Sequence, residues 1–278
     1  MTEVTAHHGL FKDTNLHVDD TGGAGRPVVL IHGWPLSGAS WSEQVPALTA
    51  AGHRVVTYDR RGFGRSDKTR SGYDYDTLAD DLHSLLEQLD LRDVTLVGFS
   101  MGGGEVARYV GRYGTDRLHS VVFAGAVPPY MAKTDDNPQG PLTQEAADEM
   151  ESGLKSDEDA FYDGFVTDFF SVDGELQVTE AQRREARELT KQADHKAALK
   201  TMEAFGTTDF REDLPKVTVP TLVIHGGSDA IVPFEGSGAR THAAVAGSRL
   251  HVVAGAPHGF NVSHAEEFNR VLLEFLAS

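Results

Sequence analysis

Short, unbroken apolar segments recur along this chain, and segments with helical periodicity lie between them. Strands that are buried on both faces of a parallel sheet have such continuous apolar sequences, because neither face meets water. The strand-like segments are 28–31, 54–59, 94–99, 118–124, 221–225 and 249–254. The helical segments are 40–51, 75–89, 102–112, 237–246 and 263–276. This alternation predicts an α/β fold in which helices cover both faces of a parallel sheet.

Two further segments, 4–8 and 15–20, precede this series and alternate polar with apolar residues. The short stretch between them predicts a β-hairpin at the start of the chain. With the hairpin added to the buried segments, we expect a mostly parallel, eight-stranded sheet.

The alternation stops after Ala124, and no strand-like segment follows until about residue 215. Helical patterns fill this interval at 143–154, 156–170, 179–192 and 195–205. The second pattern has an aromatic face at three- and four-residue spacing, formed by Phe161, Tyr162, Phe165 and Phe169. We therefore expect a core domain of residues 1–126 and 215–278, with a helical cap inserted at 127–214.

The net charge and the hydropathy pattern narrow the range of partners. The chain of 278 residues has a formal net charge of −17, which opposes binding to nucleic acid or to an anionic membrane. No apolar run approaches the roughly 18 residues of a membrane span. The first residues lack the basic start and apolar centre of a signal peptide. A cytoplasmic location is therefore expected, and a homo-oligomer is left open.

The sequence contains no cysteine. Disulfides, thiolate catalysis, cysteine-bound zinc and iron–sulfur clusters are therefore excluded. Neither H-E-x-x-H nor another metal-ligand spacing occurs, and no haem or flavin signature is present. We expect neither a metal nor a cofactor.

Gly98-Phe99-Ser100-Met101-Gly102 has the pattern G-x-S-x-G, with a strand before it and a helix after it. In this context the pattern predicts a nucleophile elbow, a turn so tight that a Cβ at either glycine would collide with its surroundings. The turn holds the serine hydroxyl above the sheet edge, where the positive end of the helix dipole favours developing negative charge. Ser100 is the predicted nucleophile.

Two other interpretations of glycine-rich segments are set aside. Residues 102–107 formally fit the dinucleotide pattern G-x-G-x-x-A, but the next strand ends in "VVFAGAVPP", without the carboxylate that would hold a ribose. "DRRGFGRSD", residues 59–67, lacks the G-K-[ST] of a phosphate loop. We interpret it as a structural turn with ion pairs.

A serine hydroxyl needs a base, and the base needs an orienting acid. In this fold class the acid follows the nucleophile along the chain, and the histidine follows the acid. Asp229 comes directly after the strand 221–225 and is the predicted acid. Asp209 and Asp213 precede that strand and cannot reach the same edge.

The predicted base is His258, in the loop between the last strand and the last helix. His251 lies within that strand and would point sideways from the sheet edge. His264 falls in the first turn of the last predicted helix, where it would support the helix start.

An oxyanion hole requires two backbone N–H groups that face the developing negative charge. Met101, the residue after the nucleophile, should supply one, and Trp34, in the loop "HGWPLSG" after the first buried strand, should supply the other. Pro35 has no N–H and cannot donate, although it should fix the loop. We interpret His32 as a residue that holds this loop in place.

Several segments together resemble one group of the α/β-hydrolases. "HGWPLSGASW", "YDRRGFGRSD", "GFSMGGGEVARYV" and "GAPHGFNVSHAEEFNRVLLEFL" are similar to the cofactor-free (non-haem) haloperoxidases and arylesterases. The resemblance extends from about Val28 to the C-terminus and is weak in the cap. "HGGSDAIVP" departs from relatives that often carry another acidic residue in place of Gly227.

The resemblance places the family's nucleophile on Ser100, its acid on Asp229 and its base on His258. It implies ester hydrolysis through an acyl-enzyme, with Trp34 and Met101 as oxyanion donors. It also implies that hydrogen peroxide can replace water, giving a peracid that oxidises halide. In this group a proline directly after the oxyanion aromatic residue accompanies good perhydrolysis, and Pro35 matches that pattern.

The expected activity is hydrolysis of short-chain or aryl esters, with perhydrolase and haloperoxidase side activity. We expect a small, apolar substrate pocket, lined by Trp34, Pro35, Phe99, Met101, Phe165 and Ile231. Hydrolysis of amides, lactones or carbon–carbon bonds by the same residues remains an alternative, as does a slow-turnover ligand receptor. Ser100 argues against haloalkane dehalogenases and epoxide hydrolases, which use an aspartate nucleophile.

Overall fold

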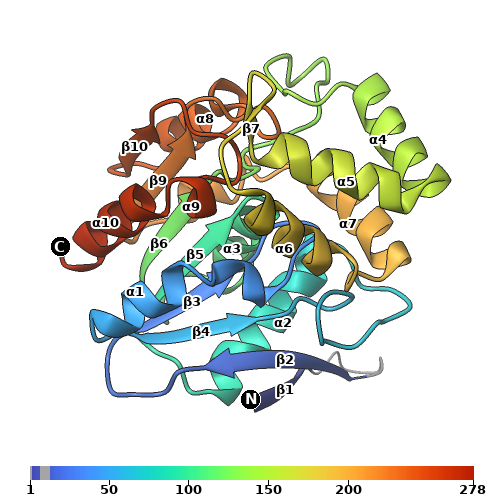
Figure 1. Ribbon diagram of the computed structural model, residues 1–278. Coiled ribbons are helices and arrows are strands. Elements are labelled where there is room, and N and C mark those ends of the chain that lie inside the picture. Colours follow the sequence, from blue (N-terminus) through green and yellow to red (C-terminus); the bar gives the residue numbers. More distant parts are fainter. Residues whose placement is uncertain (1, 7–12) are drawn as a thin grey trace.

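The computed structural model describes residues 2–6 and 13–278. An eight-stranded sheet lies at its centre, in the order β1-β2-β4-β3-β5-β6-β9-β10 (Figure 1). β2 runs antiparallel to both of its neighbours, and the remaining pairs are parallel. The strands are β1 (Thr2–Ala6), β2 (Thr14–Asp20), β3 (Pro27–Ile31), β4 (Arg54–Tyr58), β5 (Val94–Phe99), β6 (Leu118–Ala124), β9 (Thr221–Gly226) and β10 (Arg249–Val253). The predicted sheet is confirmed, but β10 is an edge strand whose residues are mostly exposed, not buried on both faces as its apolar sequence predicted.

The hairpin at the start of the chain is also present. β1 pairs with β2 so that Val4 lies opposite Leu16. β1 begins earlier than the predicted strand 4–8 and ends at Ala6. His7 and His8 of that prediction, and most of the turn after them, lie outside the described residues.

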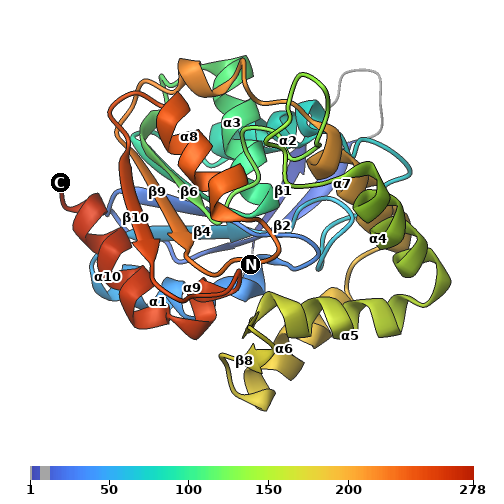
Figure 2. The same ribbon diagram turned by 90° about the horizontal axis from the view of Figure 1, so that it is seen from above.

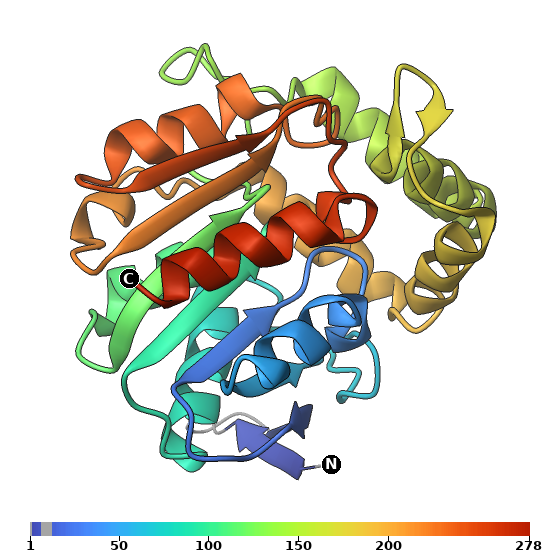
Figure 3. The ribbon, with the colours of Figure 1, turned by 60° about the vertical axis from the view of Figure 1, so that its left-hand side comes forward.

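Helices cover both faces of this sheet, as predicted. α2 (Tyr75–Gln88), α3 (Met101–Tyr113) and α8 (Gly238–Ala244) pack on one face. α1 (Gln44–Ala50) and α10 (Ala265–Leu276) pack on the other, which faces the viewer in Figure 3. The sheet therefore separates two buried apolar cores.

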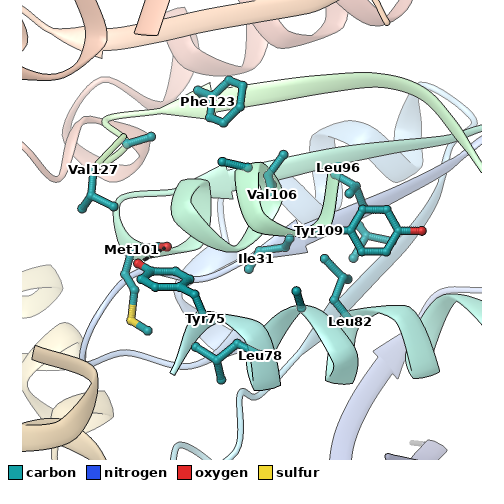
Figure 4. Close-up of a cluster of buried hydrophobic side chains, with 14 of the residues drawn as sticks. Ile31, Tyr75, Leu78, Leu82, Leu96, Met101, Val106, Tyr109, Phe123 and Val127 are labelled. Atoms are coloured by element: carbon teal, nitrogen blue, oxygen red, sulfur yellow. Dashed lines mark hydrogen bonds between the residues drawn. The ribbon is translucent and has the colours of Figure 1, made fainter. Parts of the chain in front are cut away.

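The central strand β5 contributes to both cores, because successive strand residues point to opposite faces. Leu96 belongs to the core beneath α2 and α3, which Figure 4 shows with Leu82 and Val106. Val97 and Phe99 belong to the core beneath α1 and α10. Ser100 follows directly, at the carboxyl edge of the sheet.

Two predicted helices are interrupted. The segment 40–51 divides into a 3-10 turn, η1 (Gly38–Trp41), and α1. Pro46 explains the division, because a proline inside a continuous helix would remove a hydrogen bond, whereas in the first turn of α1 its missing N–H costs nothing. The last helix is preceded by a short turn, α9 (Phe260–Ser263), and breaks at His264. His264 therefore precedes α10 instead of lying in its first turn.

The interval 127–214 is mainly helical, as expected. Its helices gather on the side of the molecule away from α10 (Figure 2). They are α4 (Gln144–Ser156), α5 (Glu158–Phe169), α6 (Glu180–Thr190) and α7 (His195–Thr207). We call this interval the cap segment.

The expectation of no strand in the cap segment is wrong. β7 (Ser171–Val172) and β8 (Glu175–Leu176) form a small antiparallel hairpin. Its two-residue loop is Asp173-Gly174, and both residues have positive φ, at 50° and 80°. Asp-Gly favours this type of hairpin turn, so the dipeptide was a signal that the sequence analysis missed.

Candidate active site

Ser100 lies in a strained turn between β5 and α3. Its backbone has φ 54° and ψ −119°, a conformation that non-glycine residues rarely adopt. A Cβ at Gly98 would lie 2.5 Å from the Gly102 carbonyl oxygen, and one at Gly102 would lie 2.5 Å from the Ile31 carbonyl oxygen. The two glycines thus let the strand and the helix approach closely enough to form the turn.

His258 connects Ser100 with Asp229 across the carboxyl edge of the sheet. Its Nε2 lies 2.9 Å from Ser100 Oγ, and its Nδ1 lies 2.6 Å from Asp229 Oδ2. Because an ionised carboxylate only accepts hydrogen bonds, Nδ1 carries the proton and Nε2 is left to accept from the serine hydroxyl. All three residues are buried, with Ser100 the most exposed at 7%.

Asp229 is fixed by further donors. Its Oδ1 accepts hydrogen bonds from the backbone N–H groups of Ile231 and Val232, at 3.0 and 2.8 Å. His225 Nε2 lies 3.3 Å from Oδ2. Burial by itself raises the pKa of Asp229, but the charge of His258 and hydrogen bonds from His225 and His258 outweigh it and lower that pKa to about 2.

The sequence analysis did not assign a role to His225. It lies at the end of β9, fully buried, and its Nε2 also contacts the Val232 carbonyl oxygen at 2.8 Å. Its position four residues before Asp229, at the end of a buried strand, was the available signal.

The N–H groups of Trp34 and Met101 adjoin the serine turn. Trp34 lies in the loop after β3, and a Cβ on its neighbour Gly33 would come within 3.1 Å of Ser100 Cβ. Met101 is the first residue of α3. Within residues 2–6 and 13–278, neither N–H donates to a protein acceptor. Two backbone donors are therefore available at the serine turn, and that of Met101 lies at the positive end of α3.

A buried ionic network lies behind these donors. Arg60 Nε donates to Glu105 Oε2 in α3 at 2.8 Å, and Arg60 Nη2 donates to the His32 carbonyl oxygen at 2.8 Å. His32 Nε2 accepts from the Arg60 N–H, and its Nδ1 lies 2.8 Å from the Gly33 carbonyl oxygen. The network joins the loop of Trp34 to the helix of Met101.

Burial dominates the electrostatics of this network. The Arg60 and Glu105 side chains are 1% and 0% exposed. Burial raises the pKa of Glu105, although the charge of Arg60 opposes that change. Burial, together with the charge of Arg60, holds the pKa of His32 well below its usual value. Arg61 also pairs with a buried acid, Asp81, so the predicted structural turn with ion pairs is confirmed.

A small cavity of about 40 Å³ opens onto Ser100. Apart from Ser100, its lining is apolar or aromatic: Trp34, Val127, Met131, Leu142, Met150, Phe165, Phe205, Ile231 and Val232. Trp34, Phe165 and Ile231 therefore lie where the predicted pocket puts them. The other lining residues come mainly from the cap segment, and the sequence analysis missed them.

Three residues of the predicted pocket are not among those that line this cavity. Pro35 follows Trp34 through a cis peptide bond and is not among the lining residues. The Met101 side chain is fully buried beside Tyr75, whose hydroxyl donates to the Met101 carbonyl oxygen at 3.0 Å (Figure 4). The ring of Phe99 lies 5.2 Å from that of His258 instead.

Phe99 and Phe169 line a second hollow, of about 420 Å³. The Phe169 ring lies 5.0 Å from the ring of His258. Residues of η1, α6 and α9 also line this hollow, and Leu189 is one of those on α6. The two phenylalanine rings thus lie between the hollow and the imidazole.

The cap segment surrounds the Trp34 ring. Four aromatic rings lie 5.1 to 6.2 Å from it, those of Phe161, Tyr162, Phe165 and Phe205. Trp34 Nε1 also donates to the Ala198 carbonyl oxygen of α7 at 3.0 Å. One predicted oxyanion residue is therefore held by the segment that forms most of the cavity wall.

Neither metal-ligand clusters nor long apolar helices occur in the described part of the chain. Its histidine, aspartate and glutamate side chains form no group of three or more suited to hold a metal ion. None of its helices combines the length and apolarity that crossing a membrane requires.

Comparison with known proteins places these features in context. The sequence profile of a family described as alpha/beta hydrolase fold matches residues 26–265. A non-heme chloroperoxidase of Kitasatospora aureofaciens is 45% identical over 91% of this chain and 93% of its own. A bifunctional esterase/perhydrolase of Acinetobacter calcoaceticus is 38% identical, over 93% and 95%. The crystal structure of a bromoperoxidase from Bacillus anthracis superimposes with a TM-score of 0.95 at 51% identity, covering 100% of this chain and 99% of that one.

Proposed function

The chain belongs to the alpha/beta hydrolase fold family, and on that premise we propose that it is a serine hydrolase of short-chain or aryl carboxylic esters. One observation carries the proposal: a continuous hydrogen-bonded series runs from Ser100 through His258 to Asp229, and at the same turn two backbone N–H groups donate to no acceptor among the described residues. The esterase and perhydrolase names of its relatives support the same activity.

Acylation begins when Ser100 Oγ attacks the ester carbonyl carbon while His258 Nε2 takes the hydroxyl proton. Asp229 holds the imidazole by its Nδ1 and stabilises the imidazolium that forms. The N–H groups of Trp34 and Met101 bind the carbonyl oxygen as it becomes negative. His258 then gives the proton to the departing alcohol, and an acyl group remains on Ser100.

The cavity favours a short acyl chain. Its volume of about 40 Å³ accommodates only a few heavy atoms, and apart from Ser100 its lining offers no hydroxyl, carboxylate or cationic side chain. An acetyl or propionyl group fits such a wall, whereas a charged or long acyl group does not.

Water releases the acyl group from Ser100, and hydrogen peroxide is the second acceptor we propose. Peroxide attack on the acyl-enzyme gives a peracid, which oxidises halide without a metal. Relatives named chloroperoxidase, bromoperoxidase and perhydrolase support this side activity. The partners are thus a small ester and hydrogen peroxide.

We assign the enzyme to the cytoplasm, where a protein without cysteine fits the reducing conditions.

The test compares wild type with Ser100→Ala on p-nitrophenyl acetate and p-nitrophenyl octanoate, each with and without peroxide. We expect steady turnover of acetate by the wild type alone, peracid only when peroxide is present, and poor use of octanoate. A panel of amides, lactones and diketones checks the alternative hydrolases. Hydrolysis that stops after one acylation would support a slow-turnover receptor and refute the esterase.

A further inference from the structure

Two thioether side chains form part of the wall that faces Ser100. The sequence has five methionines, and Met131 and Met150 line the 40 Å³ cavity that contains Ser100. Met101 and Met202 are also buried, at 0% and 6% exposure, but they are not among the lining residues. The chain therefore contains two methionines at the acyl site and two buried methionines away from it.

Met131 and Met150 are held at the cavity by different elements. Met131 follows β6, and its carbonyl oxygen accepts from the Leu142 N–H at 2.9 Å, which fixes the backbone there. Met150 lies on α4 and is partly buried. Apart from these residues, Ser100 and the Trp34 indole, the lining is hydrocarbon. Sulfur is the most polarisable and most readily oxidised atom of such a wall.

We propose that Met131 and Met150 are modification sites, converted to methionine sulfoxide by the peracid that forms on Ser100, and that this oxidation limits the enzyme's own perhydrolysis. The inference rests on the proposed perhydrolase activity and identifies where its product reacts first. Because the cavity holds little more than an acyl group, the new peracid contacts these side chains before it reaches bulk solvent.

The chemistry balances in two steps. Hydrogen peroxide attacks the acyl carbon while His258 takes its proton, and the proton passes to Ser100 Oγ as the ester bond to serine breaks. A sulfur lone pair then attacks the terminal peroxy oxygen of the peracid, the O–O bond breaks, and the proton moves to the carboxylate that leaves. Sulfur is oxidised by two electrons, the peracid is reduced by two, and a sulfoxide and a carboxylic acid result.

Methionine sulfoxide makes the cavity wall more polar. A sulfoxide oxygen is a strong hydrogen-bond acceptor, and an unpaired polar group in an apolar site carries a desolvation cost. Acyl groups then bind less well. We therefore expect KM for p-nitrophenyl acetate to rise as sulfoxide accumulates during perhydrolysis.

The first experiment maps oxidation by peptide mass spectrometry after reaction with p-nitrophenyl acetate and peroxide. Control reactions are peroxide alone, ester alone, Ser100→Ala with both, and Ser100→Ala with added peracetic acid. In the complete reaction we expect about tenfold more sulfoxide at Met131 and Met150 than at Met101 and Met202. The first three controls should leave both cavity methionines unmodified.

Equal oxidation of all four methionines, oxidation of Trp34 in their place, or the same pattern in Ser100→Ala with both reagents would overturn the inference. Bromide with a halogen acceptor reports peracid independently. If peracid forms and Met131 and Met150 stay reduced, this inference alone fails. If no peracid forms, the proposed perhydrolysis itself fails.

A second experiment follows inactivation, with each variant normalised to its own initial rate. Met131→Leu combined with Met150→Leu keeps the volume nearly constant and removes sulfur. We expect its half-life during perhydrolysis to lengthen by about threefold or more, because the oxidisable wall is gone. Met202→Leu, the same substitution away from the cavity, should inactivate like wild type. Identical half-lives for all three proteins would show that sulfoxide does not limit the reaction.

Discussion

The two sides of Ser100 are built from different interactions. On the core side, directional contacts surround it: His258 Nε2 at 2.9 Å, with Asp229 Oδ2 2.6 Å from the same imidazole. On the cap side, apolar and aromatic residues face it without a charged group. Hydrogen bonds fix angles, whereas packing fixes volume and shape. Changes on the core side should therefore alter the rate, and changes on the cap side should alter which acyl group is accepted.

The largest expected effect comes from removing the nucleophile or base. Ser100→Ala and His258→Ala should each lower kcat for p-nitrophenyl acetate by at least about 10⁴-fold, because neither leaves an activated oxygen. His251→Ala is the matched control, since His251 lies within β10 and its Nε2 contacts Glu267 of α10 at 2.7 Å. A comparable loss in His251→Ala would contradict the assignment of the base.

Asp229→Asn should lower kcat by about 10³- to 10⁴-fold, because an amide can hold the imidazole in the wrong tautomer. The same variant tests the lowered pKa of the Asp229 carboxyl group. Asp229 has a folded-state pKa of about 2 against an ordinary 3.8, so its contribution to stability is present above about pH 4 and lost as pH falls toward 2. That contribution is about 2 kcal/mol.

Denaturant unfolding across pH 2 to 5 measures this contribution. The difference in unfolding free energy between wild type and Asp229→Asn should narrow as the pH falls. A difference that stays constant over that range would show that Asp229 is not held ionised in the folded protein.

Substitutions in the buried ionic network of Arg60 and Glu105 should have the next largest effect on the core side. Glu105→Gln leaves the buried charge of Arg60 without its partner and should lower the free energy of unfolding by about 3–5 kcal/mol. Glu151→Gln makes the same change in an exposed pair with Lys155, where both side chains are more than half exposed. Its effect should stay below about 1 kcal/mol. Equal losses of unfolding free energy in Glu105→Gln and Glu151→Gln would contradict the distinction between the buried and the exposed ion pair.

On the cap side, enlarging the cavity should change selectivity more than rate. Leu142→Ala should shift the preference in kcat/KM from acetate toward hexanoate by about tenfold, because a hydrophobic pocket discriminates acyl length by volume. Leu189→Ala, in the hollow beyond Phe99, is the control and should leave the preference unchanged. An unchanged preference in Leu142→Ala would place the acyl group elsewhere.

Pro35 should give the smallest effect. Pro35→Leu should lower the ratio of peracid formation to ester hydrolysis by a few-fold, because the proline fixes the loop beside the Trp34 donor. Ester cleavage should remain largely intact. Both rates can be followed in one peroxide titration, and a constant ratio would refute this role for Pro35.

The sequence predicted the core side well because its residues occupy strand ends. Ser100 and Asp229 each follow a buried parallel strand, and His258 follows the parallel edge strand β10. Parallel strands all end at one edge of the sheet. Trp34, the proposed loop donor, follows β3 in the same way. Position along the chain was therefore enough to bring these residues together, although their catalytic roles remain proposals.

The cap side could not be predicted to the same depth. Met131, Leu142, Met150 and Phe205 reach the cavity through the packing of separate segments, which helical periodicity does not encode. Phe99 was misplaced for a local reason. It is the last residue of β5, directly before Ser100, so its side chain points to the face that α10 covers. Its ring contacts that of His258 there.

The bond from the Trp34 indole to the Ala198 carbonyl oxygen has a consequence for exchanging the cap segment. In the proposed mechanism, the helices that select the acyl group also hold the residue that stabilises the developing charge, so exchanging them should affect both. A transplanted cap without an acceptor at the position of Ala198 should release the Trp34 indole and loosen the proposed oxyanion donor.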